Sequence, residues 1–502
     1  GAGAAATATA GTYTGSITPS AATGGTFNAS NYTISYATGD LIIDKAAITI
    51  MANTVHKTYG QTLTTTTGST AYTITSGTLQ NAETIGSVTI TYGTGAAATA
   101  TAGTYTGSIT PSAATGGTFS ASNYTISYAT GDLIIDKAAI TIMANTVHKT
   151  YGQTLTTTTG STAYTITSGT LQNAETIGSV TITYGTGAAA TATAGTYTGS
   201  ITPSAATGGT FNASNYTISY ATGDLIIDKA AITITANTVH KTYGQTLTTT
   251  AGSTAYTITS GTLQNAETIG SITIAYGAGA AATATAGTYT GSITPSAATG
   301  GTFNASNYTI SYATGDLIVD KAAITITANT IHKTYGQTLT TTTGSTAYTI
   351  TSGTLQNSET IGSITIAYGA GAAATATAGT YTGSITPSAA TGGTFNASNY
   401  TISYATGDLI VDKAAITITA NTVHKTYGQT LTTTTGSTAY TITSGTLQNS
   451  ETIGSITIAY GAGAAATATA GTYTGSITPS AATGGTFNAS NYTISYATGD
   501  LI

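Results

Sequence analysis

Cysteine and tryptophan are absent from this chain of 502 residues, and methionine occurs only twice. Without cysteine, a disulfide scaffold is excluded. Charge is scarce too: 5% of the residues are Asp, Glu, Lys or Arg, against about 25% in an ordinary soluble domain. The net charge of −6 leaves no basic face, so we expect no nucleic-acid partner. Strong helix formers other than alanine are nearly missing, which excludes an all-α protein and a coiled coil.

Long apolar runs are also missing. The longest aliphatic runs have three residues, as in Leu41-Ile42-Ile43, whereas a membrane helix needs roughly 18. We therefore expect no membrane span in this stretch. The first residues, Gly1-Ala2-Gly3-Ala4, lack the charged start of a signal peptide. We expect the native chain to continue upstream of them.

What the sequence has in abundance is repetition. The segment Gly11–Pro19 recurs at steps of 92 residues without insertion or deletion. That period is too long for a solenoid coil and suits one small β-sandwich domain. It predicts a half repeat, four whole repeats and a fifth that lacks its last two residues. The predicted boundaries are 1–44, 45–136, 137–228, 229–320, 321–412 and 413–502.

Strand signals fill each period. Within one repeat, apolar and hydroxyl residues alternate in five segments, which is typical of half-buried antiparallel strands. Thr, Ile and Tyr also favour strands. The alternating segments are Ile48–Ile50, Tyr72–Thr75, Val88–Tyr92, Tyr105–Ile109 and Tyr124–Tyr128, and Leu133–Ile135 is a further short strand.

Turn signals separate these strands. Pro111-Ser112 and Gly116-Gly117 are among the predicted turns. The stretch Leu79–Ile85 lacks alternation, and we interpret it as a helical turn. The resulting fold class is all-β: a tandem array of Ig-like antiparallel β-sandwich domains. No Pro/Gly/Ser linker interrupts Asp132–Thr141, so we expect a rod, roughly 200 Å long if strands run about ten residues at 3.3 Å.

The same residues resemble a known family, the MBG domain of the YGX type. Its signature triplet would be Tyr59-Gly60-Gln61, and the resemblance covers every repeat. It implies a β-sandwich in long tandem arrays of large bacterial surface proteins, often adhesin-like, with no enzyme activity. The segments that carry it are Ile48–Asn53, Lys57–Gln61, Gly103–Tyr105, Asn123–Ile126 and Gly131–Ile135.

From these features we expect a structural stalk or filament segment of a giant bacterial adhesin, extracellular and at the cell surface. Copies of the chain are expected to associate laterally or end to end, because the small net charge provides little electrostatic repulsion between neighbouring copies. The alternative is that each repeat is a weak glycan- or surface-binding module acting by avidity. We expect no enzyme, no catalytic residue and no cofactor, because no repeat holds a nucleophile–base–orienter set.

Metal sites have few candidates. Each repeat holds one histidine and no cysteine, which argues against zinc. Asp132 and Asp136 flank the junction between repeats and are the candidates for calcium. The alternative is that they are solvated charges at the strand ends, with Lys137 neutralising Asp136.

The sequence also contains candidate residues for two covalent modifications. Asn31-Tyr32-Thr33 is an N-x-T glycosylation sequon that recurs in each repeat, although asparagine also suits a turn before a strand. A lysine could instead form an isopeptide crosslink with an asparagine, assisted by Glu83. The residues considered for that crosslink are Lys45, Lys57, Asn53, Asn81 and Asn123.

Overall fold

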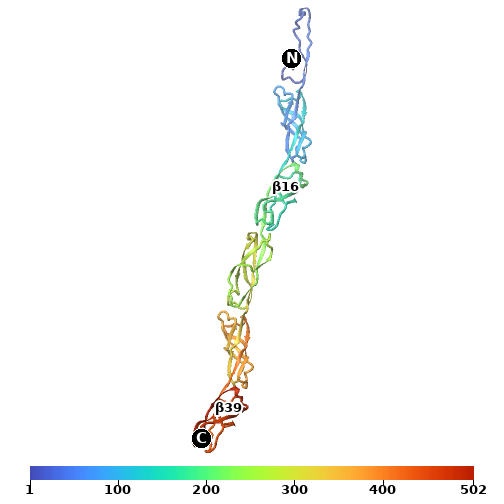
Figure 1. Ribbon diagram of the computed structural model, residues 1–502. Helices are drawn as coiled ribbons and strands as arrows, with labels where there is room; N and C mark the ends of the chain where they lie inside the picture. Colours follow the sequence, from blue (N-terminus) through green and yellow to red (C-terminus); the bar gives the residue numbers. More distant parts are fainter. The chain divides into compact units, whose positions relative to one another are not determined.

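The computed structural model describes residues Gly1–Ile502, and it consists of strands, turns and short 3-10 helices of three residues each. No helix in it is long and apolar enough to cross a bilayer. The predicted all-β class and the tandem repeat are confirmed, because the same elements recur at steps of 92 residues. Figure 1 shows that each repeat is one contiguous stretch of chain, with β16 (Gly195–Gly209) and β39 (Tyr473–Gly485) labelled.

Contacts between residues divide the chain into two compact units. The first contains the half repeat and the first two whole repeats, and the second contains the fourth and fifth repeats with most of the third. The first unit comprises Gly1–Ala231, Leu263–Ala266 and Asn304–Thr309, and the second comprises Ile232–Thr262, Glu267–Phe303 and Ile310–Ile502.

One repeat contains two sheets. In the first whole repeat a sheet of three strands has the order β6-β3-β9, and a sheet of five has the order β4-β10-β8-β7-β5. The elements are β3 (Ala46–Ala52), β4 (Val55–Thr58), β5 (Thr66–Ser69), β6 (Tyr72–Ser76), β7 (Ile85–Tyr92), β8 (Gly103–Gly117), η2 (Ala121–Asn123), β9 (Tyr124–Ala129) and β10 (Gly131–Asp136). Repeats two to four carry the same elements as β11–β18, β19–β26 and β27–β34.

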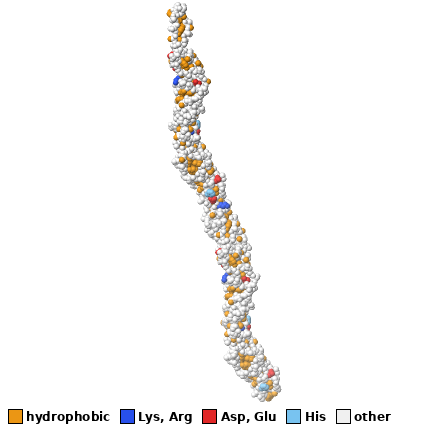
Figure 2. All heavy atoms as spheres, turned by 180° about the vertical axis from the view of Figure 1, so that it is seen from behind, with side chains coloured by type: hydrophobic (Ala, Val, Ile, Leu, Met, Phe, Trp, Pro, Cys, Tyr) orange, Lys and Arg blue, Asp and Glu red, His pale blue; other side chains and the backbone are white.

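The core lies between the two sheets. Ile50 from the smaller sheet and Ile109 and Leu133 from the larger one are all fully buried. Alternation places these apolar side chains on one face of each strand and leaves threonine on the other. Most of the visible surface in Figure 2 is accordingly neutral and polar, with few charged side chains.

Two of the six strand pairings in the first whole repeat are parallel. β3 runs parallel to β9 and β4 runs parallel to β10, whereas the other four pairs are antiparallel as predicted. The two parallel pairs are continuous with each other, because β3 leads into β4 through Asn53-Thr54 and β9 leads into β10 through Thr130, and both pass from the smaller sheet to the larger one. The alternation of apolar and polar residues determines which face of a strand is buried, but not whether the neighbouring strand runs parallel or antiparallel. The parallel pairings could therefore not be predicted from the sequence.

The predicted turn at Pro111-Ser112 is wrong. Pro111 lies inside the 15-residue strand β8 and pairs with Ile90 of β7. The register shifts just beyond it, between Thr89 and Ser87, where Ala113 has a φ of 46°. The proline therefore marks a β-bulge, a place where a strand tolerates a residue without an N–H donor.

The helical turn predicted over Leu79–Ile85 is also wrong. Asn81 and Ala82 have φ angles of 51° and 57°, which is the left-handed region. The Glu83 N–H closes the turn on the Gln80 carbonyl at 2.9 Å. This tight turn, rather than a helix, presents Glu83 at the end of the repeat.

The half repeat and the fifth repeat depart from this pattern. The half repeat has a sheet of two strands, β1 (Gly11–Ile17) and β2 (Gly39–Ile43), with η1 (Ala29–Asn31) between them. The larger sheet of the fifth repeat has four strands, in the order β36-β38-β39-β41. Its elements are β35 (Ala414–Ala420), β36 (Thr434–Ser437), β37 (Tyr440–Ser444), β38 (Ile453–Tyr460), β39, η6 (Ala489–Asn491), β40 (Tyr492–Ala497) and β41 (Gly499–Leu501).

Candidate functional site

The Tyr-Gly-Gln triplet forms a tight turn directly after β4. The Tyr59 N–H donates to the Asp136 carbonyl at 2.8 Å, which continues the parallel pairing by one residue. The Gln61 side chain folds back, and its Oε1 accepts from the Thr58 N–H at 2.8 Å. The ring of Tyr59 is thereby fixed at the end of its repeat, where 4% of the residue is exposed.

Tyr59 is buried because it docks on the following repeat. Its hydroxyl donates to Glu175 Oε1 at 2.6 Å, and the hydroxyl of Tyr216 donates to Oε2 of the same carboxylate at 2.7 Å. The two rings meet edge to face, with centroids 5.5 Å apart. One glutamate therefore joins two tyrosines from two successive repeats, and we call this arrangement the tyrosine clamp.

The second unit contains the same clamp twice. Tyr243 and Tyr400 donate to Glu359 at 2.5 and 2.7 Å. Tyr335 and Tyr492 donate to Glu451, both at 2.6 Å. Both ring pairs have centroids 5.5 Å apart. The contact is thus a regular feature of the junctions inside each unit.

Gly60 is required by this docking. Its φ is 92°, a conformation that side chains rarely adopt, and a Cβ there would collide with the side chain of Gln172 in the next repeat. Gly244 in the second unit meets Gln356 in the same way. The glycine of the triplet therefore permits both the turn and the close approach of the neighbouring repeat.

Two asparagines extend the junction beyond the clamp. Asn215 Oδ1 accepts from the Ala102 N–H of the preceding repeat at 3.0 Å, and Asn173 Nδ2 donates to the Ala98 carbonyl at 3.2 Å. Asn215 is 2% exposed. It is also the asparagine of a recurring N-x-T sequon, so the folded junction shields this amide from glycosylation.

Burial affects the ionisation of the clamp. It raises the pKa of Tyr59, Tyr216, Tyr243 and Tyr400 above the ordinary value, and the neighbouring glutamate carboxylate raises it further. The hydroxyls are therefore kept protonated, which is the form that donates to the carboxylate.

A buried lysine supports the triplet from within its own repeat. Lys57 Nζ donates to the carbonyls of Gln61, Ala96 and Ala97 at 2.9, 3.1 and 2.7 Å. Burial lowers its pKa. All three partners are backbone oxygens, so this lysine has no asparagine side chain at hydrogen-bond distance with which to form an isopeptide bond. It ties the triplet to the segment that faces Asn173 and Asn215.

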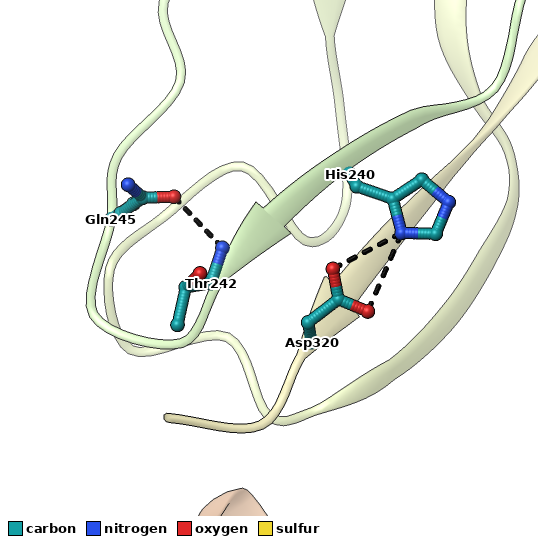
Figure 3. Close-up of polar contacts among 4 residues, drawn as sticks. All are labelled: His240, Thr242, Gln245 and Asp320. Atoms are coloured by element: carbon teal, nitrogen blue, oxygen red, sulfur yellow. Dashed lines mark hydrogen bonds and ion pairs between the residues drawn. The ribbon is translucent and has the colours of Figure 1, made fainter. Parts of the chain in front are cut away.

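In the first four whole repeats the histidine lies on a strand of the larger sheet. Figure 3 shows His240 from β20 (Val239–Thr242) beside Asp320 at the end of β26 (Gly315–Asp320). His240 Nδ1 lies 3.1 Å from Asp320 Oδ2, and both side chains are more than half exposed. Such an exposed pair adds little stability.

The two aspartates predicted as calcium ligands interact with other groups of the protein. Asp132 Oδ1 accepts from the Gly107 N–H at 2.9 Å, and Asp136 Oδ2 lies 3.1 Å from His56 Nδ1. The two aspartates occupy opposite ends of β10, and no group of three His, Cys, Asp or Glu is positioned to hold a metal. Calcium at this junction stays a prediction.

Sequence reasoning named Tyr59 only as part of a signature, Glu83 only as an assisting acid for an isopeptide crosslink, and Asn123 only as a partner for that crosslink and as the counterpart of the sequon asparagine Asn31. The structure brings their counterparts together at one junction. A signal was present: each repeat holds one glutamate and one Tyr-Gly-Gln triplet, both at fixed positions in the period. Because the partners lie in different repeats, a search within one repeat could not pair them.

Comparison with known proteins identifies the family of the repeats. The family model described as MBG domain (YGX type) matches five segments, at residues 48–134, 140–226, 232–318, 324–410 and 416–502. No curated protein and no solved structure matches the chain. The residues that give the family type its name are those that dock one repeat on the next. The chain belongs to the MBG domain (YGX type) family.

Proposed function

We propose that the chain is a non-enzymatic structural segment of a large bacterial surface protein, located outside the cell, whose repeats form an extended spacer. The tyrosine clamp carries this proposal. A spacer must resist bending where its domains meet, and the clamp places directional hydrogen bonds to a half-buried carboxylate at that point.

The covalent connection supports the same role. β10 ends at Asp136 and β11 (Ala138–Ala144) begins two residues later, so a single residue links the repeats. Tyr243 also belongs to the apolar cluster formed chiefly by the fourth repeat. Side chains of one repeat thus complete the core of the next, which opposes independent domain motion.

Small-angle scattering tests the spacer. The wild-type chain is compared with a variant carrying Glu175→Ala, Glu359→Ala and Glu451→Ala, each with and without a calcium chelator. We expect a maximum dimension near the summed repeat lengths for the wild type in both conditions, and a broader distribution of shorter distances for the variant. The control is Glu83→Ala, because Glu83 accepts from one tyrosine alone, Tyr124.

Two outcomes of this experiment would count against the spacer or against the role of the clamp in it. If the wild type is compact or broadly distributed, the spacer proposal fails. If it extends only in the presence of calcium, the junction depends on Asp132 and Asp136 rather than on the clamp.

A second candidate function is weak binding of glycans or surfaces by each repeat. It is favoured by a tyrosine on β9 and its counterparts, since Tyr220, Tyr312 and Tyr404 are each 37 or 38% exposed. An exposed ring can stack on a sugar, and repetition multiplies weak contacts. Saturable binding of the whole chain to a glycan array, lost when these tyrosines become alanine, would support this function over the spacer alone.

A further inference from the structure

Tyrosine is the main oxidisable side chain of this protein. The chain has 33 tyrosines and two methionines, and it has neither cysteine nor tryptophan. A one-electron oxidant that reaches the protein therefore acts mostly on tyrosine. The oxidised side chain is a phenoxyl radical, and two such radicals combine when their rings are in contact. The positions of the tyrosine rings consequently decide which products form.

The tyrosine clamps hold pairs of rings in contact across the junctions. Tyr243 and Tyr400 meet edge to face, with centroids 5.5 Å apart and an interplanar angle of 79°. They are 4 and 3% exposed. Because both hydroxyls donate to Glu359, the hydroxyl-bearing ends of the two rings converge on one carboxylate. The ring carbons beside the hydroxyl are the positions at which phenoxyl radicals couple, and the clamp brings these ends of the rings together.

Neither ring is free to turn away from the other. The hydroxyl of Tyr400 also accepts from the Gln356 N–H at 2.7 Å, and its ring packs on Phe395 with centroids 5.1 Å apart. The Tyr243 N–H donates to the Asp320 carbonyl at 2.8 Å. Reactive groups that are fixed in contact react far faster than the same groups free in solution. A bond between these two rings is therefore favoured over bonds between tyrosines that meet by collision.

The glutamate of the clamp supplies the proton acceptor that the oxidation requires. Burial raises the pKa of Tyr243 and Tyr400, and the carboxylate of Glu359 raises it further, so both hydroxyls stay protonated at neutral pH. A protonated phenol releases its proton when it loses an electron, and Glu359 is already hydrogen-bonded to that proton. The glutamate is half-buried, so the proton can pass from it to solvent.

We propose that each tyrosine clamp is a site of oxidative crosslinking, at which the two tyrosines join by a carbon–carbon bond to form dityrosine. Two equivalents of a one-electron oxidant, such as the high-valent iron of a peroxidase, remove one electron from each ring. Each hydroxyl releases one proton by way of the glutamate. The two phenoxyl radicals couple at the carbons beside the hydroxyls, and the hydrogen on each of these carbons then moves to the oxygen, which restores both phenols. Two electrons and two protons leave in total.

The crosslink makes the junction permanent. A single residue separates β26 from β27 (Ala322–Ala328), and the new bond adds a second covalent connection between the same two repeats. The loop that it closes is longer than one period of 92 residues. Closing a long loop removes conformations from the unfolded chain, as a disulfide does, and this bond needs no cysteine. The inference rests on the clamp geometry and does not depend on the spacer function.

Photo-oxidation of the full chain tests the site. The protein is illuminated briefly with a ruthenium tris-bipyridine complex and persulfate, which generate a one-electron oxidant, and is then digested and mapped by mass spectrometry. We expect dityrosine within monomers, to an extent that does not change with protein concentration. Oxidation in denaturant should abolish the links, because the rings then no longer meet. The linked pairs should be Tyr59 with Tyr216, Tyr243 with Tyr400 and Tyr335 with Tyr492.

Two variants change one clamp and leave the others as internal controls. Tyr243→Phe keeps the ring but removes the phenol, and it should abolish the link to Tyr400 alone. Glu359→Gln keeps the shape of the side chain but cannot take up a proton at neutral pH, so it should slow that link several-fold. Hydrogen exchange in residues 356–360 checks that the glutamine variant stays docked. An unchanged rate in a docked glutamine variant would contradict proton transfer to the carboxylate.

Three further results would overturn the site. If free tyrosine couples under the same conditions and the clamps give no dityrosine, their rings are not positioned to bond. Links that form mainly between copies, through exposed tyrosines such as Tyr220 and Tyr312, would show that exposure rather than the clamp directs the reaction. Links that form equally well in denaturant would show that folding does not direct it.

Discussion

The hydroxyl of Tyr335 lies 2.6 Å from Oε1 of Glu451, a residue 116 positions further along the chain. The same separation recurs between Tyr59 and Glu175 in the first unit. It exceeds the period of 92 residues, so the bond always joins a repeat to its successor. Each repeat therefore offers a tyrosine at one end and a glutamate at the other.

Replacing Tyr243 by phenylalanine should weaken the junction between the third and fourth repeats. The substitution removes a hydrogen bond to a charged acceptor, worth about 1.5–3 kcal/mol, and leaves the ring packing in place. We expect faster hydrogen exchange in residues 356–360 of the neighbouring repeat. The matched control is Tyr427→Phe, which removes the same hydroxyl from an exposed side chain and should change nothing in a monomeric sample. Equal effects at both sites would contradict the clamp.

Replacing Gly244 by alanine should have a larger effect than the same change at Gly428. Both glycines have φ near 90°, so both variants carry backbone strain, which costs on the order of 1–3 kcal/mol. Only at Gly244 does the added methyl group meet a neighbour, the side chain of Gln356. Thermal unfolding and limited proteolysis should therefore show a looser junction for Gly244→Ala alone. A similar loss at Gly428 would mean that strain, not docking, explains the glycine.

Replacing Lys241 by methionine should destabilise the third repeat. Its Nζ donates to the carbonyls of Gln245, Ala280 and Ala281. Methionine fills a similar space but leaves these acceptors unpaired, and each buried unpaired group costs about 1–3 kcal/mol. Denaturant unfolding should report this loss. Lys229→Met, at an exposed lysine, should change the free energy of unfolding by less than about 0.5 kcal/mol.

Alkaline pH should open the junctions. Burial raises the pKa of Tyr216 and Tyr400 in the folded state. The stability that they contribute is present in full below pH about 10, the pKa of an unfolded tyrosine, and is lost as the pH rises above it. Buried Lys241 and Lys333 act in the opposite direction below pH 10.5, because burial lowers their pKa and unfolding there takes up protons.

Tyrosinate absorbance measured during the titration checks this prediction. Of the 33 tyrosines, those of the clamps should ionise last and together with loss of hydrogen-exchange protection at the junctions. Ionisation of all tyrosines in one step near the ordinary pKa would contradict it. The variant Tyr400→Phe should retain its junction to higher pH if the ionisation of that hydroxyl is the cause.

Much of the fold follows from the sequence because the signals are local. Threonine alternates with isoleucine along Ile48–Ile50 and Val88–Tyr92, and both segments are strands with the apolar side chains buried. The exact period predicts one fold repeated along the chain. The turn over Leu79–Ile85 and the bulge after Pro111 were missed, because each depends on backbone conformations that the residue types permit but do not demand.

The junction could not be predicted for a different reason. Glu175 lies on a turn whose left-handed residues, Asn173 and Ala174, carry no strong local signal. Tyr216 lies in the same repeat as Glu175, but Tyr59 lies in the preceding one, so the bond that joins the repeats does not appear when one period is considered alone. The glycosylation sequon at Asn215 was predicted for the same reason. One repeat alone does not show that the neighbouring repeat buries this asparagine.

The two complementary ends of each repeat also bear on how such a gene can change. Deleting or duplicating any whole period brings one triplet against one glutamate turn, as before. Unequal crossing-over between near-identical repeats would therefore lengthen or shorten the protein in steps of one domain and create no new interface. Length becomes a heritable quantity that can vary without a cost in folding.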